Sequence, residues 1–441
     1  MAKKIIQVEE KVPASLMLPL SVQHLFAMFG ATVLVPFVLG INPAIVLFMN
    51  GVGTLLFIAI TKGKAPAYLG SSFAFLGPAS LVIARWGYPY ALGGFVAVGF
   101  MGCILAFIIK KFGTKWIDVV LPPAAMGPVV ALIGLELSSS AASTAGIVGD
   151  GILMSNVIIF LVTLGTAIIG NLCFRKFFSI ISILIAVIVG YITAACLGAV
   201  DFAPIGQAAL FQMPNFQFPK FSWSAILTML PVILVIASEH VGHQIVTSQI
   251  VGRDLIKDPG LDKTIFADNF STMISGLVGS VPTTTYGENI GVMALTGVYS
   301  VWVIGGAAVL SICCAFIGPL CALIQSIPSA VIGGISFLLY GMIGVSGLRI
   351  LIDEKVDYGN TVNMILTSVV FVTGLSGVTV QLGDIALSGM VLAALVGILM
   401  SLMIYIFNKL HLLNENSSEP QGEMKVLEEV VEAEQKAKAS K

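Results

Sequence analysis

Apolar stretches long enough to cross a lipid bilayer follow one another along almost the whole of this sequence. Of the 441 residues, 57% are hydrophobic and only 10% are charged, a composition that fits no class of soluble globular protein. The 46 glycines and 19 prolines indicate helices that pack closely and break often, as in transporters. The sequence therefore predicts an all-α, polytopic membrane protein.

The number of spans follows from length and from the basic residues. A bilayer requires about 20 apolar residues per crossing helix, and Lys and Arg accumulate in cytoplasmic loops. With a cytoplasmic N-terminus and fourteen spans, only Arg85 and Lys220 of the 22 basic residues lie on the outer side. Both termini are then cytoplasmic. The fourteen predicted spans are residues 14–39, 44–62, 66–84, 89–109, 121–137, 153–174, 178–199, 222–246, 264–281, 285–300, 302–326, 329–350, 359–380 and 384–408.

The rest of the composition argues against other partners and sites. With 22 Lys and Arg against 23 Asp and Glu, the chain lacks the basic excess that nucleic-acid binding requires. All six cysteines lie in apolar stretches, so we predict no disulfide and no metal site. The charged residues 1–11 do not resemble a cleavable signal peptide, and the polar tail after Asn414 is expected to carry no chemistry.

Spans seven apart along the chain resemble each other. Residues 121–127 match residues 327–333 in the order of Pro, Ala and Gly, and residues 65–73 match residues 281–288 in an order of Pro, a β-prone stretch, an aromatic and Gly. Because seven is odd, the two halves have opposite orientations, as in the inverted repeats of secondary transporters. The two β-prone stretches can pair as a two-stranded bridge, leaving two half-helix N-termini at a common central point. Ordinary proline kinks are the alternative for each break taken alone.

A carboxylate within a span is a functional hypothesis by default, because burial in the bilayer costs about 2.5–3.5 kcal/mol on insertion scales. Glu239 and His243 lie four residues apart and share one helical face, whereas His240 points about 100° away. Such a face suits a ligand site that binds protons; the alternative is a pair that only holds helices together. We expect Asp268 to cap or brace cytoplasmic helix ends and Glu136 to lie near the outer surface.

Glu288 follows the second break, at the predicted start of a half-helix. Free backbone N–H groups there can donate to a ligand carbonyl while Glu288 accepts from a ligand N–H, which would suit a planar molecule with both groups. Phe73, at the matching first break, offers a ring face for stacking, or it only packs. His24 is expected to be a satisfied core histidine that holds the two half-sites together.

Residues 288–297, which read Glu-Asn-Ile-Gly-Val-Met-Ala-Leu-Thr-Gly, resemble the signature of the nucleobase-ascorbate transporters, also called nucleobase:cation symporter family 2. Gly297 at the last position is similar to the pyrimidine branch, whose bacterial members include uracil permeases. The similarity covers nearly the whole chain, including residues 23–30, 70–73, 238–243 and 252–255.

This resemblance implies a proton-coupled uracil importer of the bacterial inner membrane that works by alternating access. Its two halves of seven spans each would be related as an inverted repeat. It implies a core domain and a gate domain, a homodimer through the gate domains, and no cofactor besides the proton. The implied segments are a cytoplasmic N-terminus 1–13, core halves 14–120 and 221–326, gate halves 121–220 and 327–408, and a cytoplasmic tail 409–441.

The resemblance also implies roles for individual residues. The implied uracil-binding residues are Phe73, Glu239, Tyr286, Gly287, Glu288 and Tyr340. The implied proton-coupling residues are Glu239, His243, Glu288 and Tyr340. Residues with a structural role near the site are His24, Ser72 and Asn289.

The sequence disfavours three other functions. A xanthine or other purine permease of the same family is disfavoured by Gly297. An anion transporter is disfavoured because paired acids repel an anion. An intramembrane enzyme is disfavoured because the sequence contains neither a Gly-x-Ser-x-Gly elbow nor a His-Glu-x-x-His helix.

Overall fold

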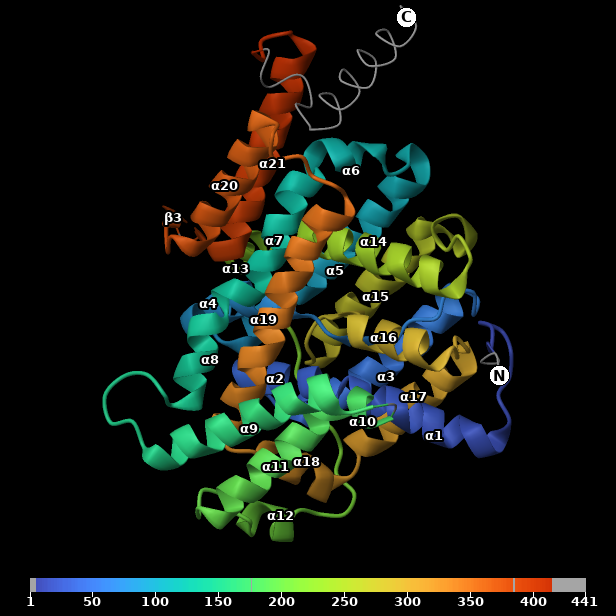
Figure 1. The fold of residues 1–441 in the computed structure, drawn as a ribbon, viewed down its shortest axis with the longest axis vertical. Coiled ribbons are helices and arrows are strands. Elements are labelled where there is room, and N and C mark those ends of the chain that lie inside the picture. The colour runs from blue at the N-terminus through green and yellow to red at the C-terminus, as the bar shows by residue number, and fades with distance from the viewer. Residues whose placement is uncertain (1–4, 176, 384, 415–441) are drawn as a thin grey trace, which may run out of the picture.

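The structure, a computed structural model, describes residues 5–175, 177–383 and 385–414, and these residues form mainly helices (Figure 1). Among them, eight helical stretches are long and apolar enough to cross a membrane, and four further apolar helices are shorter. The chain is therefore a mostly helical, multi-pass membrane protein. The predicted polar tail lies outside the described residues, except for its first residues up to Asn414.

The elements fall into four consecutive groups along the chain. The first comprises α1 (Ala14–Ala27), α2 (Phe29–Leu39), α3 (Pro43–Ile60), β1 (Leu69–Ser71), η1 (Phe73–Phe75), α4 (Leu76–Trp86) and α5 (Tyr88–Phe112). The second comprises α6 (Lys115–Val120), α7 (Pro123–Glu136), α8 (Ser138–Ala145), α9 (Met154–Cys173), α10 (Phe177–Ile180), α11 (Ser182–Cys196) and α12 (Ala203–Gln207).

The third and fourth groups complete the described chain. The third comprises α13 (Trp223–Met229), α14 (Val232–Val251), η2 (Ile256–Gly260), α15 (Leu261–Val278), β2 (Thr283–Thr285), α16 (Gly287–Thr296), α17 (Val301–Ala315) and α18 (Gly318–Gln325). The fourth comprises α19 (Ser329–Asp353), α20 (Thr361–Leu375), β3 (Thr379–Leu382), β4 (Ile385–Ser388) and α21 (Gly389–Lys409).

Helices from alternate groups pack together. In the first and third groups, α15 packs on α5 and α3, and α17 packs on α3 and α1. In the second and fourth groups, α19 packs on α7, α8 and α9, and α20 and α21 pack on α7. In Figure 1 the gold α16 and α17 accordingly lie beside the blue α1 and α3, away from the orange and red α20 and α21.

Two predicted spans are broken in the structure at proline. Within residues 222–246, α13 ends at Met229 and α14 begins at Val232, with Pro231 between them. Within residues 302–326, α17 ends at Ala315 and α18 begins at Gly318, followed by Pro319. Proline has no N–H for the helical hydrogen bond and its ring clashes with the preceding turn, so each predicted span consists of two helices.

The largest error of the sequence prediction lies between the last two spans. Residues 379–388 were assigned mainly to helical spans, but β3 and β4 form an antiparallel hairpin there, with Leu382 paired to Ile385. Gly377 and Gly383 have φ angles of 72° and 61°, a conformation that only glycine adopts readily. Their positive φ angles end α20 and turn the hairpin.

The second small sheet joins the two halves of the chain. β1 pairs antiparallel with β2, with Leu69 opposite Thr285, Gly70 opposite Thr284 and Ser71 opposite Thr283. All six residues are buried. The segments lie far apart in sequence, so this pairing places the start of η1 and α4 beside the start of α16.

Candidate functional site

The paired strands are held by hydrogen bonds that satisfy their buried backbone. Thr54 accepts a hydrogen bond at Oγ1 from the Leu69 N–H (2.9 Å). Thr272 donates from Oγ1 to the Thr283 carbonyl (2.8 Å) and accepts from the Thr283 N–H (3.1 Å). An unpaired backbone group within a membrane costs several kcal/mol, so these threonines allow extended chain at this depth.

Tyr286 lies between β2 and α16 and fixes the start of that helix. Its N–H donates to the Tyr68 carbonyl (3.1 Å) and its hydroxyl donates to the Ser71 carbonyl (2.9 Å). The ring crosses β1 at Gly70, where any Cβ atom would collide with it. Because the side chain and the N–H of Tyr286 are both used in these contacts, only its carbonyl oxygen, which also accepts from the Ile290 N–H, is left for the implied uracil contact.

The first turn of α16 is open to a ligand. Gly287 and Glu288 are exposed, although Tyr286 before them and Asn289 after them are buried. In the part of the chain that the structure describes, no side-chain hydrogen bond caps this helix. The N–H groups of the first turn have no partner within the helix, and the helix dipole is positive at that end. A carbonyl group on a ligand could accept from them.

Helix α14 presents Glu239 and His243 to the same place. Nδ1 of His243 lies 3.0 Å from Oγ1 of Thr285 in β2, and its Nε2 lies 3.5 Å from the position a Cβ atom would take on Gly287. Glu239 lies one helical turn before His243 on the same face of α14, and α14 contacts α16. Among the described residues, Glu239 Oε2 has no hydrogen-bond partner, so it is available to an N–H donor.

An aromatic contact connects the first break to a helix of the fourth group. The rings of Phe73 in η1 and Tyr340 in α19 meet edge to face, with their centroids 6.3 Å apart and an angle of 86° between them. Tyr340 is buried because α19 packs closely on α7, where any Cβ atom at Gly134 would collide with the Tyr340 carbonyl. Phe73 is only partly buried, so part of its ring faces open space.

The three residues assigned a structural role surround the two breaks. The Asn289 side chain lies 3.1 Å from Nδ1 of His24 and donates to the His24 carbonyl (3.1 Å), which ties α16 to α1. The Ser72 N–H donates to the Pro282 carbonyl (2.9 Å). Both contacts join the two halves of the chain.

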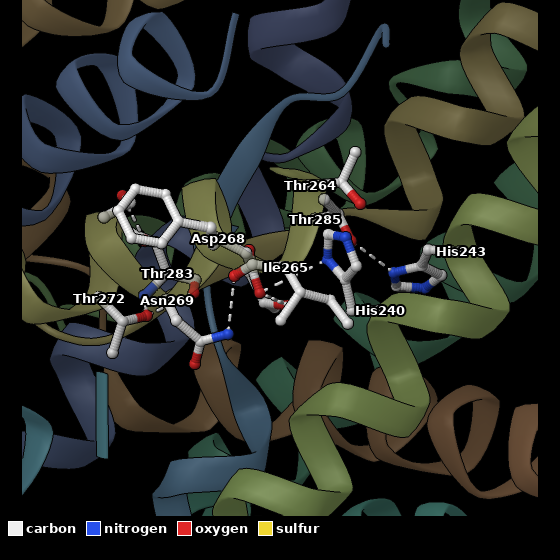
Figure 2. A network of polar contacts seen from close by, with 12 residues as sticks. His240, His243, Thr264, Ile265, Asp268, Asn269, Thr272, Thr283 and Thr285 are labelled. Atoms are coloured by element: carbon white, nitrogen blue, oxygen red, sulfur yellow. Dashed lines mark hydrogen bonds and ion pairs between the residues drawn. The ribbon is translucent and has the colours of Figure 1, made fainter. Parts of the chain in front are cut away.

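Asp268 does not cap or brace a helix end, contrary to the sequence prediction. It is fully buried in the middle of α15, with Oδ2 3.5 Å from Nδ1 of His240 and 3.5 Å from Oγ1 of Thr284 (Figure 2). The helix begins at Leu261, about two turns earlier. The side of α14 next to the face of Glu239 and His243 therefore has an acid–imidazole contact of its own.

Thr285 and the His240–Asp268 contact were absent from the predicted site. An acid inside a span was the signal for Asp268, but no sequence spacing relates residue 240 to residue 268.

Glu136 is half-buried, and its Oε2 accepts from the Met390 N–H at the start of α21 (2.8 Å). Among the described residues, no group of three His, Cys, Asp or Glu side chains is arranged to hold a metal ion.

Comparison with known proteins gives three informative matches. The profile of the Permease family matches residues 16–383. The uracil permease of Paenibacillus larvae is 52% identical over 94% of this chain and 100% of its own length. The uracil permease of Escherichia coli K12 is 53% identical over 91% of this chain and 94% of its own length.

A solved structure shares the fold. The murine Slc26a9 anion transporter in its inward-facing state superposes with a TM-score of 0.69 at 11% sequence identity, covering 91% of this chain and 69% of that one. At this identity the likeness concerns the fold alone.

Proposed function

Because this chain belongs to the Permease family, the nucleobase-ascorbate transporters that its sequence resembles, we propose that it imports uracil together with protons across a bacterial inner membrane. Permeases are transporters, so the chain is not an enzyme. The choice of uracil is supported by two relatives named uracil permease that are more than half identical along nearly the whole chain.

One observation carries this proposal: His243, on the face of α14 that also carries Glu239, lies beside Gly287 at the open start of α16, next to Glu288. Uracil is a flat ring with two N–H groups and two carbonyl groups. In the proposed complex the two carboxylates accept from the ring N–H groups, and the N–H groups of Gly287 and Glu288 donate to a carbonyl. Phe73 covers one face of the ring, and Tyr340 contacts it from α19.

The proton is proposed to bind among Glu239, His243, Glu288 and Tyr340. Two carboxylates that interact electrostatically disfavour each other's charged forms, and a neighbouring imidazole can accept or give up a proton near physiological pH. Binding of a proton would reduce the negative charge beside α16. The loaded site could then move through the membrane at a smaller electrostatic cost.

Alternating access is proposed to occur between a core domain and a gate domain, with residues 14–120 and 221–326 in the core and 121–220 and 327–408 in the gate. The packing of first-group helices on third-group helices, and of second-group on fourth-group helices, supports this division. Fourteen crossings, a repeat of seven spans in opposite orientations, cytoplasmic termini and a homodimer through the gate domains complete the proposal.

Uptake by the purified protein in proteoliposomes tests the function. Radiolabelled uracil should accumulate faster with an inward proton gradient, and a protonophore should remove the acceleration. Uptake indifferent to the gradient would point to a facilitator without proton coupling. Stronger competition by unlabelled xanthine than by unlabelled uracil would assign the chain to purines instead.

A further inference from the structure

The chain before α1 forms a short strap across the C-terminal end of α16. The Ile6 N–H donates to the Gly297 carbonyl (2.9 Å), and the Tyr299 N–H donates to the Ile6 carbonyl (2.9 Å). Ile6 and Val298 form a parallel bridge, and the Val301 N–H donates to the Val8 carbonyl (2.9 Å). Residues 6–12, called the strap from here on, therefore pair with the connection between α16 and α17.

Two buried valines and one side-chain hydrogen bond also hold the strap. Val8 is fully buried in the main hydrophobic core, and Val12 packs on Val298 and Val303. Ser300 donates from Oγ to the Glu10 carbonyl (2.6 Å). The apolar packing and the backbone pairing hold the strap in one register on the connection.

Glu9 connects the strap to a second helix of the site. Nη1 of Arg253 donates to both carboxylate oxygens of Glu9, at 2.6 and 2.9 Å. Arg253 follows α14 directly, and its N–H donates to the Ser248 carbonyl in the last turn of that helix (3.1 Å). The strap thus contacts the C-terminal ends of both α14 and α16, the helices that carry Glu239 and Glu288.

The same stretch of chain also holds the other end of α16. The strap continues through Pro13 into α1, where His24 binds Asn289 in the first turn of α16. Helix α16 has only ten residues, and a helix shorter than about 12 residues has little stability of its own. Its position therefore depends on contacts at its two ends.

We propose that the strap is a positioning element, in which Glu9, Arg253 and Val8 fix the C-terminal end of α16 relative to α14 and so set the separation of Glu288 from Glu239. This inference rests on the proposed uracil site. Small displacements of binding groups cost much affinity, so loosening the strap weakens uracil binding although no strap residue touches the site.

The test measures uracil affinity and the mobility of α16 separately. Arg253→Gln and Glu9→Gln remove the ion pair, and Glu9→Arg combined with Arg253→Glu reverses it. An exposed ion pair contributes enough for about a two- to fivefold change in Kd and KM. We expect this rise in both single variants, with Vmax per folded protein unchanged, partial recovery in the reversed pair, and faster amide hydrogen exchange in residues 287–297.

A control and a further variant distinguish a specific effect of the strap from a general loss of folding. Arg349 and Asp353 form an exposed ion pair within α19, remote in sequence from the strap, and Arg349→Gln should change neither the Kd nor the exchange of α16. Val8→Asp should detach the strap and raise the Kd further in the fraction that remains folded by size-exclusion chromatography.

Two results would overturn the inference. One is an unchanged Kd and unchanged exchange of α16 in all strap variants; the other is a loss of folded protein with the Kd of the remainder unaltered. Failure of the unaltered protein to bind uracil would instead contradict the proposed function, and hydrogen exchange of α16 would still decide whether the strap positions it.

Discussion

Glu239 and Glu288 lie on two helices that contact each other, α14 and α16, and a different kind of feature places each of them. Glu239 lies within the continuous helix α14, where spacing alone puts it on the face of His243. Glu288 lies in the first turn of α16, and its place depends on the extended residues of β2 and on the Tyr286 contacts with Tyr68 and Ser71. The position of Glu239 therefore follows from helical periodicity, whereas the position of Glu288 follows from the extended segment that interrupts the helix before it.

Removal of either acid should prevent transport. A hydrogen bond to a charged group contributes about 1.5–3 kcal/mol, so Glu239→Ala or Glu288→Ala should raise the uracil Kd by about 10- to 150-fold. Isothermal titration with the purified variants measures this. Glu136→Gln is the matched control, since its side-chain oxygen can still accept from Met390. Normal uptake by both alanine variants would refute the site assignment.

Phe73 should contribute through the face of its ring. Stacking of a base on an aromatic side chain is worth about 1–3 kcal/mol by alanine substitution, so Phe73→Ala should raise the KM for uracil by about 5- to 150-fold. Phe73→Leu keeps the apolar volume without the ring and should recover little. Phe107→Ala, at a ring that is 61% exposed, serves as the control. Equal KM values for the three variants would exclude stacking on Phe73.

Local sequence rules predicted the placement of some residues of the candidate site. The i, i+4 spacing gave the shared face of Glu239 and His243, and Pro282 with Gly287 marked the start of α16. Thr285 beside His243, and Asp268 beside His240, depend on how β2 and α15 lie against α14. No pattern within one element contains that information.

At the scale of elements, the pairing of β1 with β2 depends on Gly70, which admits the Tyr286 ring. Gly70→Val should separate the strands and destabilise the protein by about 1–3 kcal/mol, as overpacking does elsewhere, and it should abolish uracil binding. Thermal unfolding in detergent measures the first effect. Gly165→Ala, at a helical glycine with open space around it, should unfold at or above the original temperature.

The strap should respond to acid in a defined direction. The hydrogen bond from Arg253 lowers the pKa of Glu9 below its ordinary value of 4.5. Because the folded-state pKa is the lower one, the stabilisation is complete above pH 4.5 and is lost as the pH falls through the folded-state pKa. The strap should therefore remain attached between pH 6 and 8, because this whole interval lies above 4.5.

Trp302 offers a probe of this behaviour, because its Nε1 donates to the Glu9 carbonyl (3.3 Å) and Lys11 lies over its ring. With the other tryptophans replaced by Phe, its fluorescence should be constant at neutral pH and change only in acid. Glu9→Gln should shift the signal at neutral pH and remove the acid-dependent step. An acid step of the same size in Glu9→Gln would assign it to another group.

Element boundaries were predicted less well than element types. Apolar length located most helices, but the proline breaks at residues 231 and 319 were absorbed into continuous spans. The β3–β4 hairpin was missed because its residues, such as Val380 and Leu387, are apolar enough to extend the neighbouring spans. The Gly383-Asp384 pair between two β-prone runs was the available signal for a tight turn.

For the whole molecule, the segregation of basic residues predicts which loops face the cytoplasm. With single cysteines in a cysteine-free variant, Lys220→Cys should react with a membrane-impermeant maleimide in intact cells. Lys257→Cys should react only after the membrane is permeabilised. Labelling of both positions from the same side of the membrane would contradict the proposed fourteen-span topology. The interleaving of the four groups of helices, by contrast, was inferred from the family resemblance and not from composition.

The antiparallel bridge between Leu69 and Thr285 has a consequence for biosynthesis. Among the described residues, β1 and β2 have no strand partner other than each other. A ribosome that has translated only the first half of the chain has therefore not yet produced both strands of the bridge. Closure waits until the later strand emerges, and two separately translated pieces should recover uptake only when both are inserted into the same membrane.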